Sequence, residues 1–512
     1  MQKQGILRGI SALIIVLIMG LGTAASAQFE YERFAGYLTD TNGAALSGTV
    51  TINRVNVTTK LDGYFELYVP FAEQYVINAT AQGYVPHSQV YVGPGLHDLK
   101  LQVRKGQVFT IDTTQPVNVT DSRGSRILLP AGALVNRNGQ APTGPIQMTV
   151  HTYDLRTEEM VGDMSALDVN GQPVTLLSIG AVSVDFTDAA GNFYNLAPGK
   201  KATLSVLTDP GNPYSGPIPM WWYDTSRGLW IEEGQGTVQN GVATAQVSHF
   251  TVWNFDMQFS NASCVQVTVD YNWWRSRGYN SLRPLRLRVT VPSPWYSIRE
   301  LTIRYYEEFN AIYNVGNNLN LQLDIWNATT SQWEPYAIVN SGAGWGSAGQ
   351  TPPYPYSVCN GAVTLNGVPT AGKLTGQVRR QHRSLHGGVS VQVSIAGSTF
   401  TTTTDNNGNF SVLVPAGTGS ARASLLGYLP AQRASVSATG GATVSLPQVT
   451  LLAGDVDGNL CVNTADTGAI NSAVGTSASA NDPRNINGDT WIYYDDLGLA
   501  SFNGGLCGPM GW

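Results

Sequence analysis

Two short stretches of this sequence carry oxygen-bearing side chains at a spacing that suits a metal ion. In each stretch, Asp or Asn occupies loop positions 1, 3, 5 and 12, and Gly occupies position 4. Such a loop can wrap one hard cation that prefers many oxygen ligands, and calcium is the natural occupant. The predicted ligands are Asp455, Asp457, Asn459 and Asp466 in the first loop, and Asn485, Asn487, Asp489 and Asp496 in the second. Cys461 and Trp491 stand at position 7, which needs only a backbone carbonyl.

The second loop begins 30 residues after the first, and a stretch of helical character follows each loop. Asp, Asn and Gly also dominate ordinary turns, so a pair of acidic turns is the alternative interpretation. The repeated spacing favours two calcium sites over that alternative. Because Asn485 stands where the first loop has Asp, the second ligand set carries fewer charges, and we expect it to bind calcium more weakly.

At these residues the chain resembles a bacterial dockerin, a duplicated loop-helix module that docks onto cohesin domains. The resemblance covers residues 451–512 and implies two bound calcium ions and a protein partner. In dockerins, loop positions 10 and 11 often carry Ser or Thr for cohesin contact. Here they are Thr464-Ala465 in the first repeat and Tyr494-Asp495 in the second. Calcium is therefore the more specific expectation, and a cohesin-like partner the less specific one.

Length and composition limit the possible number of domains, the fold class and the class of partner. A length of 512 residues predicts about three to five domains. Only 12% of the residues are charged, and Thr and Val recur in alternating runs, which is typical of folded β domains. The net charge of −6 argues against a nucleic-acid partner, which would call for a basic face. We therefore expect a mainly β protein of tandem β-sandwich domains, with a small α-helical module over residues 451–512.

Residues 1–27 have the features of a secretory signal peptide. Lys3 and Arg8 flank the start of an apolar run, and Ala25-Ser26-Ala27 gives a small-residue cleavage pattern. A membrane anchor is the alternative, but the run is short for a bilayer. No later stretch is long and apolar enough to span a membrane. We expect a secreted or cell-surface protein with no membrane span after signal removal.

Four cysteines in an exported protein favour disulfides. Their positions suggest the pairs Cys264–Cys359 and Cys461–Cys507, because each pair brackets one compositional segment. Four cysteines permit three pairings, and free buried thiols are a further alternative. The second pair would clamp the two predicted calcium loops together.

Two distant segments share one pattern of short strands and turns. Each opens on a glycine, at Gly36-Tyr37-Leu38 and at Gly376-Gln377-Val378, and each later turns into a Phe and ends on Val-Pro. Pro70 recurs as Pro415, 345 residues later, so the chain contains an internal repeat. We expect one fold for both copies, with Phe65 and Phe410 in the cores.

Both copies, at residues 28–105 and 372–450, resemble the carboxypeptidase regulatory-like domain, a small transthyretin-like β-sandwich. The matching elements are the Gly-x-Val-type opening, the Asp/Asn-Gly-x-Phe turn, the Val-Pro end and a Gly-Tyr pair near the last strand. In this family the turn glycines, Gly63 and Gly408 here, would supply a backbone conformation that other residues resist. The family implies scaffolding or interaction and no peptidase activity.

Two further β-rich segments lie between the copies. Residues 106–261 carry Ile127-Leu-Leu-Pro-Ala-Gly, Trp221-Trp-Tyr-Asp and a closing His249-Phe-Thr-Val-Trp-Asn. This pattern resembles the middle domain of cartilage intermediate layer protein and implies an extracellular structural role. Residues 262–371 show no family resemblance, but their alternation of apolar and polar residues predicts half-buried strands stapled by one disulfide.

Four tryptophans in these segments are candidates for ligand contact: Trp221, Trp222, Trp273 and Trp274. Flat aromatic faces suit pyranose rings, so these side chains could stack on a polysaccharide. The alternative is packing in cores and hairpins, which aromatics in sandwiches usually serve.

The sequence lacks the motifs of common catalytic sites. None of the six histidines belongs to an H-E-x-x-H motif, and no G-x-S-x-G is present. Acidic doublets such as Glu158-Glu159 could serve a glycosidase only if folding placed two carboxylates at the right separation. We therefore expect a non-catalytic secreted or cell-surface protein for adhesion, scaffolding or matrix interaction, with a calcium-stabilised docking module. The alternative function is a carbohydrate-binding accessory protein of a polysaccharide-degrading, cellulosome-like assembly.

Overall fold

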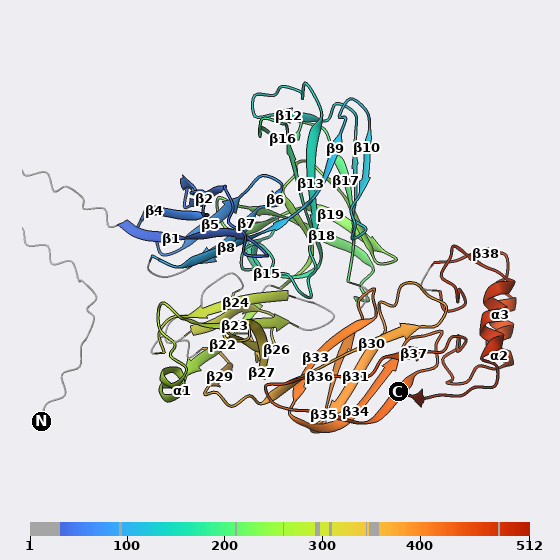
Figure 1. Cartoon of the computed structure of the whole chain (residues 1–512). Helices are drawn as coiled ribbons and strands as arrows, with labels where there is room; N and C mark the ends of the chain where they lie inside the picture. Colours follow the sequence, from blue (N-terminus) through green and yellow to red (C-terminus); the bar gives the residue numbers. More distant parts are fainter. Residues whose placement is uncertain are drawn as a thin grey trace, which may run out of the picture.

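The protein is built mainly from β-strands. The computed structural model describes residues 31–91, 95–209, 212–259, 261–291, 297–306, 310–344, 346–347, 358–479 and 482–512. The predicted signal peptide, residues 1–27, lies outside this described part of the chain. Within it, the helices are α1 (Tyr271–Ser276), α2 (Thr464–Asn471) and α3 (Tyr494–Phe502), and none is long and apolar enough to cross a membrane. The strands form a series of sheets along the chain (Figure 1), which confirms the predicted fold class of tandem β-sandwich-like domains.

The first sandwich, residues 31–105, consists of two four-stranded sheets. Their strand orders are β4-β1-β8-β6 and β3-β2-β5-β7. The strands are β1 (Tyr31–Asp40), β2 (Thr49–Ile52), β3 (Val55–Thr58), β4 (Tyr64–Pro70), β5 (Tyr75–Thr80), β6 (Tyr84–Val85), β7 (His87–Tyr91) and β8 (Leu99–Lys105). Along β4, Phe65, Leu67 and Val69 are buried while their neighbours face outward, as the period-2 pattern requires.

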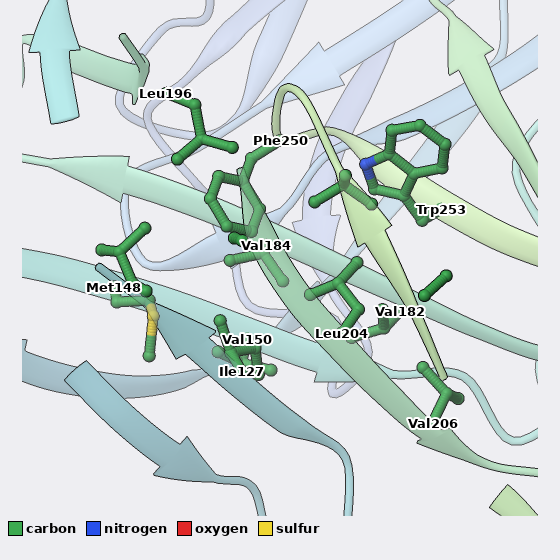
Figure 2. Close-up of a cluster of buried hydrophobic side chains, with 14 of the residues drawn as sticks. Ile127, Met148, Val150, Val182, Val184, Leu196, Leu204, Val206, Phe250 and Trp253 are labelled. Carbon is green, nitrogen blue, oxygen red and sulfur yellow. The ribbon is translucent and has the colours of Figure 1, made fainter. Parts of the chain in front are cut away.

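The largest sheet has 13 strands and spans residues 107–259. Its main path runs β10 (Val117–Thr120), β11 (Arg126–Leu129), β17 (Ala202–Leu207), β20 (Val242–Val247), β19 (Leu229–Gln239), β18 (Gly216–Asp224), β21 (Val252–Phe259), β15 (Pro173–Thr187), β13 (Ile146–Thr152) and β9 (Gln107–Ile111). Three short strands lie off that path, namely β12 (Leu134–Asn136), β14 (Ser165–Leu167) and β16 (Phe193–Leu196). Figure 2 shows side chains from β11, β13, β15 and β17 in its buried core, together with Phe250 and Trp253.

The next segment, residues 261–365, again contains two four-stranded sheets. The first holds β25 (Asn310–Val315), β22 (Asn261–Val269), β28 (Gly346–Ser347) and β29 (Gly361–Leu365). The second has the order β24 (Ser297–Ile303), β23 (Leu285–Val291), β26 (Asn320–Asn327) and β27 (Gln332–Asn340). Helix α1 begins after Asp270, whose side chain accepts the backbone N–H of Trp273 and so caps the helix.

The fourth segment is a sandwich that extends to the end of the chain. One sheet holds β33 (Asn409–Pro415), β30 (Ala371–Arg380), β36 (Thr443–Ser445) and β37 (Val449–Leu451). The other has the order β32 (Ser398–Thr403), β31 (Ser390–Ile395), β34 (Gly417–Ser424), β35 (Ala431–Ala438) and β40 (Met510–Gly511). Between β37 and β40 lie α2, α3 and the small ladder of β38 (Thr476–Ser477) with β39 (Trp491–Ile492), at the right of Figure 1.

The first and fourth sandwiches share one strand pairing, as the internal repeat predicts. In both, the opening strand pairs antiparallel with the strand after the turn and parallel with the last strand. The registers agree too, because Gly36 lies opposite Phe65 and Gly376 opposite Phe410. Gly63 has a φ of 77°, and a Cβ there would lie 2.4 Å from the carbonyl oxygen of Leu38. The turn therefore needs glycine for both its conformation and its space.

Polar contacts join the sandwiches across their boundaries. Arg156, in the loop between β13 and β14, pairs with Asp209 at 2.5 Å and donates to the backbone carbonyl of Thr403 in the fourth sandwich at 2.5 Å. Lys373 of the fourth sandwich lies 3.0 Å from Asp324 of the third segment. The Asp324 side chain is mostly buried, so this ion pair is shielded from solvent.

A carboxyl group with a shifted pKa lies at another boundary. The Oε1 of Glu159 accepts the backbone N–H of Glu300 on β24 at 3.2 Å. Burial, and to a lesser extent the charge of Glu300, raise the pKa of Glu159 to about 7. Glu300 itself pairs with Arg286 at 2.6 Å and Arg288 at 3.1 Å. Protonated Glu159 therefore suits this boundary better than ionised Glu159.

Replacing Glu159 by Gln should make the protein more stable above pH 7. The folded-state pKa of Glu159 lies above the ordinary glutamate pKa. Its contribution to the free energy of unfolding is therefore fully present below the ordinary pKa and is lost as the pH rises through about 7. At pH 8 we expect Glu159→Gln to raise the thermal midpoint, with a gain of roughly 1 to 3 kcal/mol that shrinks toward pH 5. Differential scanning calorimetry against Glu73→Gln, an exposed control, measures this. A lower midpoint for Glu159→Gln at pH 8 would contradict the assignment.

Candidate metal centre

The first predicted calcium loop, residues 455–466, is held together by one buried carboxylate. Asp466 lies in the first turn of α2 and is fully buried. Its Oδ1 accepts the backbone N–H groups of Val456 at 2.9 Å and Asp457 at 3.2 Å, and its Oδ2 accepts that of Asn463 at 2.8 Å. Asn463 in turn caps α2 through its side chain. The residue that ends the loop therefore also fixes how the loop begins.

Three carboxylates converge inside this loop. One oxygen each from Asp455, Asp457 and Asp466 lies within 4.8 Å of the others. Asp455 is only 2% exposed, and its Oδ2 accepts the N–H of Leu460 at 3.2 Å, whereas its buried Oδ1 has no hydrogen-bond partner. Burial raises the pKa of Asp455, and the charges of Asp466 and Asp457 raise it further.

This arrangement fits a hard cation. A buried anionic oxygen without a donor is unfavourable, and so is the approach of like charges. A calcium ion among these oxygens would offset both effects, because it binds carboxylate oxygens directly. Asp455, Asp457 and Asp466 are the residues that would hold it.

The other predicted ligands of the first loop lie at its rim. Asn459 is exposed, and its amide nitrogen donates to Asp457 Oδ2 at 2.9 Å. Cys461 is half-buried and disulfide-bonded to Cys507, so only its backbone carbonyl remains for the role predicted at position 7. This disulfide and Cys264–Cys359 confirm the predicted pairing.

The second loop, residues 485–496, repeats the same backbone frame. Asp496 is fully buried, and its Oδ1 accepts the N–H groups of Ile486 at 2.7 Å and Asn487 at 3.1 Å. Its Oδ2 accepts the N–H of Tyr493 at 3.0 Å. Of the remaining predicted ligands, Asn485 is fully buried and Asn487 is half-buried, while Asp489 and Trp491 are exposed. The frame is thus duplicated, but its position 1 is filled by an amide instead of a carboxylate.

The loops and helices pack directly onto the fourth sandwich. Ile470, Ile486 and Ile492 belong to the same buried cluster as Tyr428 and Leu451 of the sandwich. The side chain of Asn503, which follows α3, donates to the backbone carbonyl of Ala453 at 2.7 Å. The candidate metal centre therefore shares a buried core with the fourth sandwich.

The tryptophans predicted to contact a ligand serve mainly in packing. Trp221 is fully buried and Trp274 is 5% exposed, so the structure corrects the ligand-contact hypothesis for both. Trp222 is half-buried, with its ring edge-on to that of His249 at 5.0 Å. Trp273 is half-buried as well and fills the space beside Gly367. The packing alternative describes Trp221 and Trp274, whereas ligand contact by Trp222 and Trp273 stays a prediction.

Sequence reasoning missed a group of exposed aromatic side chains on the second repeat. Trp491, Tyr493, Tyr494 and Phe502 are 42%, 45%, 71% and 81% exposed. The rings of Trp491 and Tyr493 stack with their centroids 5.9 Å apart. The corresponding residues of the first repeat are Cys461, Asn463, Thr464 and Ser472. We call these four exposed residues of the second repeat its aromatic face. The first repeat forms the same loop and helix without aromatic residues at these positions, so a position-by-position comparison of the two repeats could have found them.

Sequence comparison identifies one domain of this multidomain β-sandwich protein. Residues 373–452 match the family of the carboxypeptidase regulatory-like domain, as predicted for the second copy. No curated protein matches the chain. Two further assignments stay predictions: a dockerin-like module at residues 451–512 and a cartilage-intermediate-layer-like domain at residues 106–261.

Several solved structures show limited similarity. A chain from a type II cohesin–X-dockerin complex of Acetivibrio cellulolyticus is 24% identical, with 27% of this chain and 97% of that chain covered and a TM-score of 0.23. The major pilin subunit of Bacillus cereus is 10% identical, with 82% of this chain and 99% of that chain covered and a TM-score of 0.14. A calcium-stabilised ice-binding adhesin of an Antarctic bacterium is 11% identical, with 78% and 91% covered and a TM-score of 0.10.

Asp466→Ala should destabilise the terminal loops even without metal. The substitution leaves three backbone N–H groups without their acceptor, and it should cost roughly 2 to 4 kcal/mol. Thermal unfolding in excess chelator measures this effect. Asp457→Ala, which removes an exposed carboxylate of the same loop, is the matched control and should change the midpoint little in chelator. Equal midpoints for Asp466→Ala and the wild type would show that the carboxylate does not hold the loop.

Proposed function

We propose that this chain is a secreted or cell-surface modular protein without catalytic activity, which acts in adhesion, scaffolding or matrix interaction. Its matched domain family is a non-catalytic fold, and its two disulfides suit an oxidising compartment. In this proposal, residues 1–27 direct export, residues 106–261 form a domain of the cartilage-intermediate-layer type, and residues 451–512 form a dockerin-like, calcium-stabilised docking module.

The observation that carries this proposal is the buried Oδ1 of Asp455, which lacks a hydrogen-bond donor and faces two further carboxylates. Structural needs alone do not explain such an oxygen, since buried polar atoms are normally paired. Calcium bound there would tie the loop to α2 through Asp466. The metal would then act as a structural ion that stabilises the docking surface.

The aromatic face of the second repeat supports the docking role. Large exposed apolar side chains that gather on one face mark interaction sites, and Trp and Tyr are frequent among residues that dominate binding energy. Asp489 and Asp495 are exposed beside these aromatics. The acidic rim favours a protein partner with an apolar centre and a basic rim, and a cohesin-like domain is the partner class that the dockerin resemblance implies.

Calcium should stabilise the full-length chain, and Asp455→Asn should abolish this effect. The substitution keeps the side-chain shape but removes a charge from the centre of the site. If calcium exceeds its dissociation constant a hundredfold, binding adds about 2.7 kcal/mol to the stability of the unit that it binds. Calorimetric unfolding with calcium and with chelator measures the difference, and Glu73→Gln is the control. Identical unfolding of the wild type in both conditions would refute the calcium role.

A second candidate function, carbohydrate binding within a polysaccharide-degrading assembly, is favoured by a different surface from the one predicted. On the first sandwich, Tyr31, Tyr37 and Tyr68 are about half exposed, at 58%, 48% and 57%. They face outward on β1 and β4, with the ion pair between Arg33 and Glu66 among them at 2.7 Å. In the fourth sandwich the corresponding positions are Ala371, Gln377 and Leu413, which carry no aromatic ring. Of the two copies, the first thus has a tyrosine face that the second lacks.

If this tyrosine face binds polysaccharide, Tyr37→Ala with Tyr68→Ala should abolish binding without unfolding the chain. Affinity electrophoresis of the full-length protein in gels that contain xylan or mixed-linkage glucan measures the retardation. Tyr494→Ala, an exposed aromatic substitution on the terminal module, should leave the retardation unchanged. Absence of retardation for the wild type, or equal retardation for the double variant, would exclude this face as a glycan site.

A further inference from the structure

The two calcium loops share one frame but differ in their interior. Their helices have the same pattern of buried and exposed residues, and Asp466 and Asp496 accept equivalent backbone N–H groups. Differences between the loops therefore do not arise from different folding of the backbone. They arise from the side chains at the ligand positions and from what the fourth sandwich places beside each loop.

Position 1 shows the clearest difference. In the first loop it is Asp455, whose Oδ1 is buried and unpaired. In the second loop it is Asn485, whose Oδ1 accepts the backbone N–H of Gly488 at 2.8 Å. The amide nitrogen of Asn485 donates to the backbone carbonyls of Asp489 at 2.8 Å and Ser479 at 3.2 Å. Because the N–H of Gly488 can donate only to an oxygen, this network fixes the orientation of the amide.

The consequence is that Asn485 offers a metal only the remaining lone pair of one neutral amide oxygen, and no negative charge. Its one side-chain oxygen is engaged by Gly488, and its nitrogen is a donor that already has two acceptors. An N–H₂ group carries partial positive charge and repels a cation. Position 1 of the second loop is therefore a poor cation ligand, and hydrogen bonds within the protein hold its amide in place without metal.

The other side chains of the second loop are engaged as well. The amide nitrogen of Asn487 donates to Asp489 Oδ2 at 3.1 Å and to Asp495 Oδ2 at 2.9 Å. The buried oxygens of Asp496 accept backbone N–H groups, as those of Asp466 do in the first loop, so this residue does not distinguish the two loops. Among the described residues, no buried unpaired oxygen comparable to that of Asp455 is found in this loop.

The fourth sandwich adds a positive charge beside the second loop only. Arg383 donates from Nη2 to the backbone carbonyl of Asn485 at 2.5 Å. Its guanidinium lies over Gly488, so close that a Cβ at this glycine would be 2.2 Å from Nη1. In the first loop the corresponding glycine, Gly458, faces the apolar side chain of Leu426. A fixed guanidinium next to one loop disfavours a divalent cation there by repulsion.

From these contacts we infer that the chain binds one calcium ion, in the first loop, and that the second loop is closed without metal by the Asn485 amide and by Arg383. The inference rests on the proposed calcium role of the first loop. It replaces the expectation of a second, weaker calcium site. The two loops have the same backbone frame but are stabilised in different ways. One copy is stabilised by calcium, and the other is stabilised by the neighbouring sandwich.

Isothermal titration of the metal-free full-length chain with calcium chloride tests this inference. We expect one ion per chain for the wild type and none for Asp455→Asn. For Asn485→Asp we expect a second ion, because the substitution restores a carboxylate at position 1. Adding Arg383→Met to Asn485→Asp should tighten the second site, since it removes the neighbouring charge. Near-ultraviolet circular dichroism in calcium verifies that each variant is folded.

Thermal unfolding gives an independent readout. Arg383→Met alone should lower the midpoint by the same amount in calcium and in chelator, because Arg383 acts without metal. Two calcium ions on the wild type, or one ion retained by Asp455→Asn, would overturn the inference while leaving the proposed calcium role intact. No calcium on the wild type would overturn the proposed role itself.

Discussion

The fold of this chain depends on one strand that is buried on both faces. Strand β15 is 15 residues long, and nearly all of it is inaccessible to solvent. Val182 and Val184 lie in the main core of the 13-stranded sheet, Leu176 and Ala181 lie in a second core on the other face, and Leu177 reaches the core of the third segment. A strand of this kind reads as a continuous apolar run, because it has no solvated face. Its burial joins the 13-stranded sheet to the third segment by apolar packing, in addition to the polar contacts across the boundaries.

Much of this architecture could be predicted from the sequence, namely those features that are set by residues close together in the chain. The glycine turn and the alternation before Pro70 and Pro415 fix a strand and its register without reference to distant residues, so the repeat was recognisable and its two copies pair alike. The backbone frame of the two terminal loops was predictable for the same reason, since Asp466 and Asp496 accept hydrogen bonds from backbone groups within their own loops. The disulfides followed from the segments that the cysteines bracket.

Features that depend on packing between distant segments were not predictable in this way. Period-2 alternation places Trp221 and Trp222 on opposite faces of β18, but it does not reveal that other elements cover the face of Trp221. Arg383 lies 102 residues before Asn485, so nothing near the loop indicates a cation beside it. The exposure of the tyrosines on β1 likewise depends on which elements of the folded chain lie over that face. The face of a strand on which a side chain lies is set by the local sequence. Whether another element covers that face depends on the whole molecule.

The attachment of the terminal loops to the fourth sandwich has a mechanical consequence. Strand β40 lies parallel to β35, the ring of Trp512 packs against Phe410, and the disulfide from Cys461 to Cys507 ties the first loop to the residues just before β40. No flexible linker separates the two parts, because both contribute to one core. A pulling force applied at the aromatic face would thus pass into the sandwich through many bonds at once. Tension on the terminal module must therefore break the shared core before the module can detach from the sandwich.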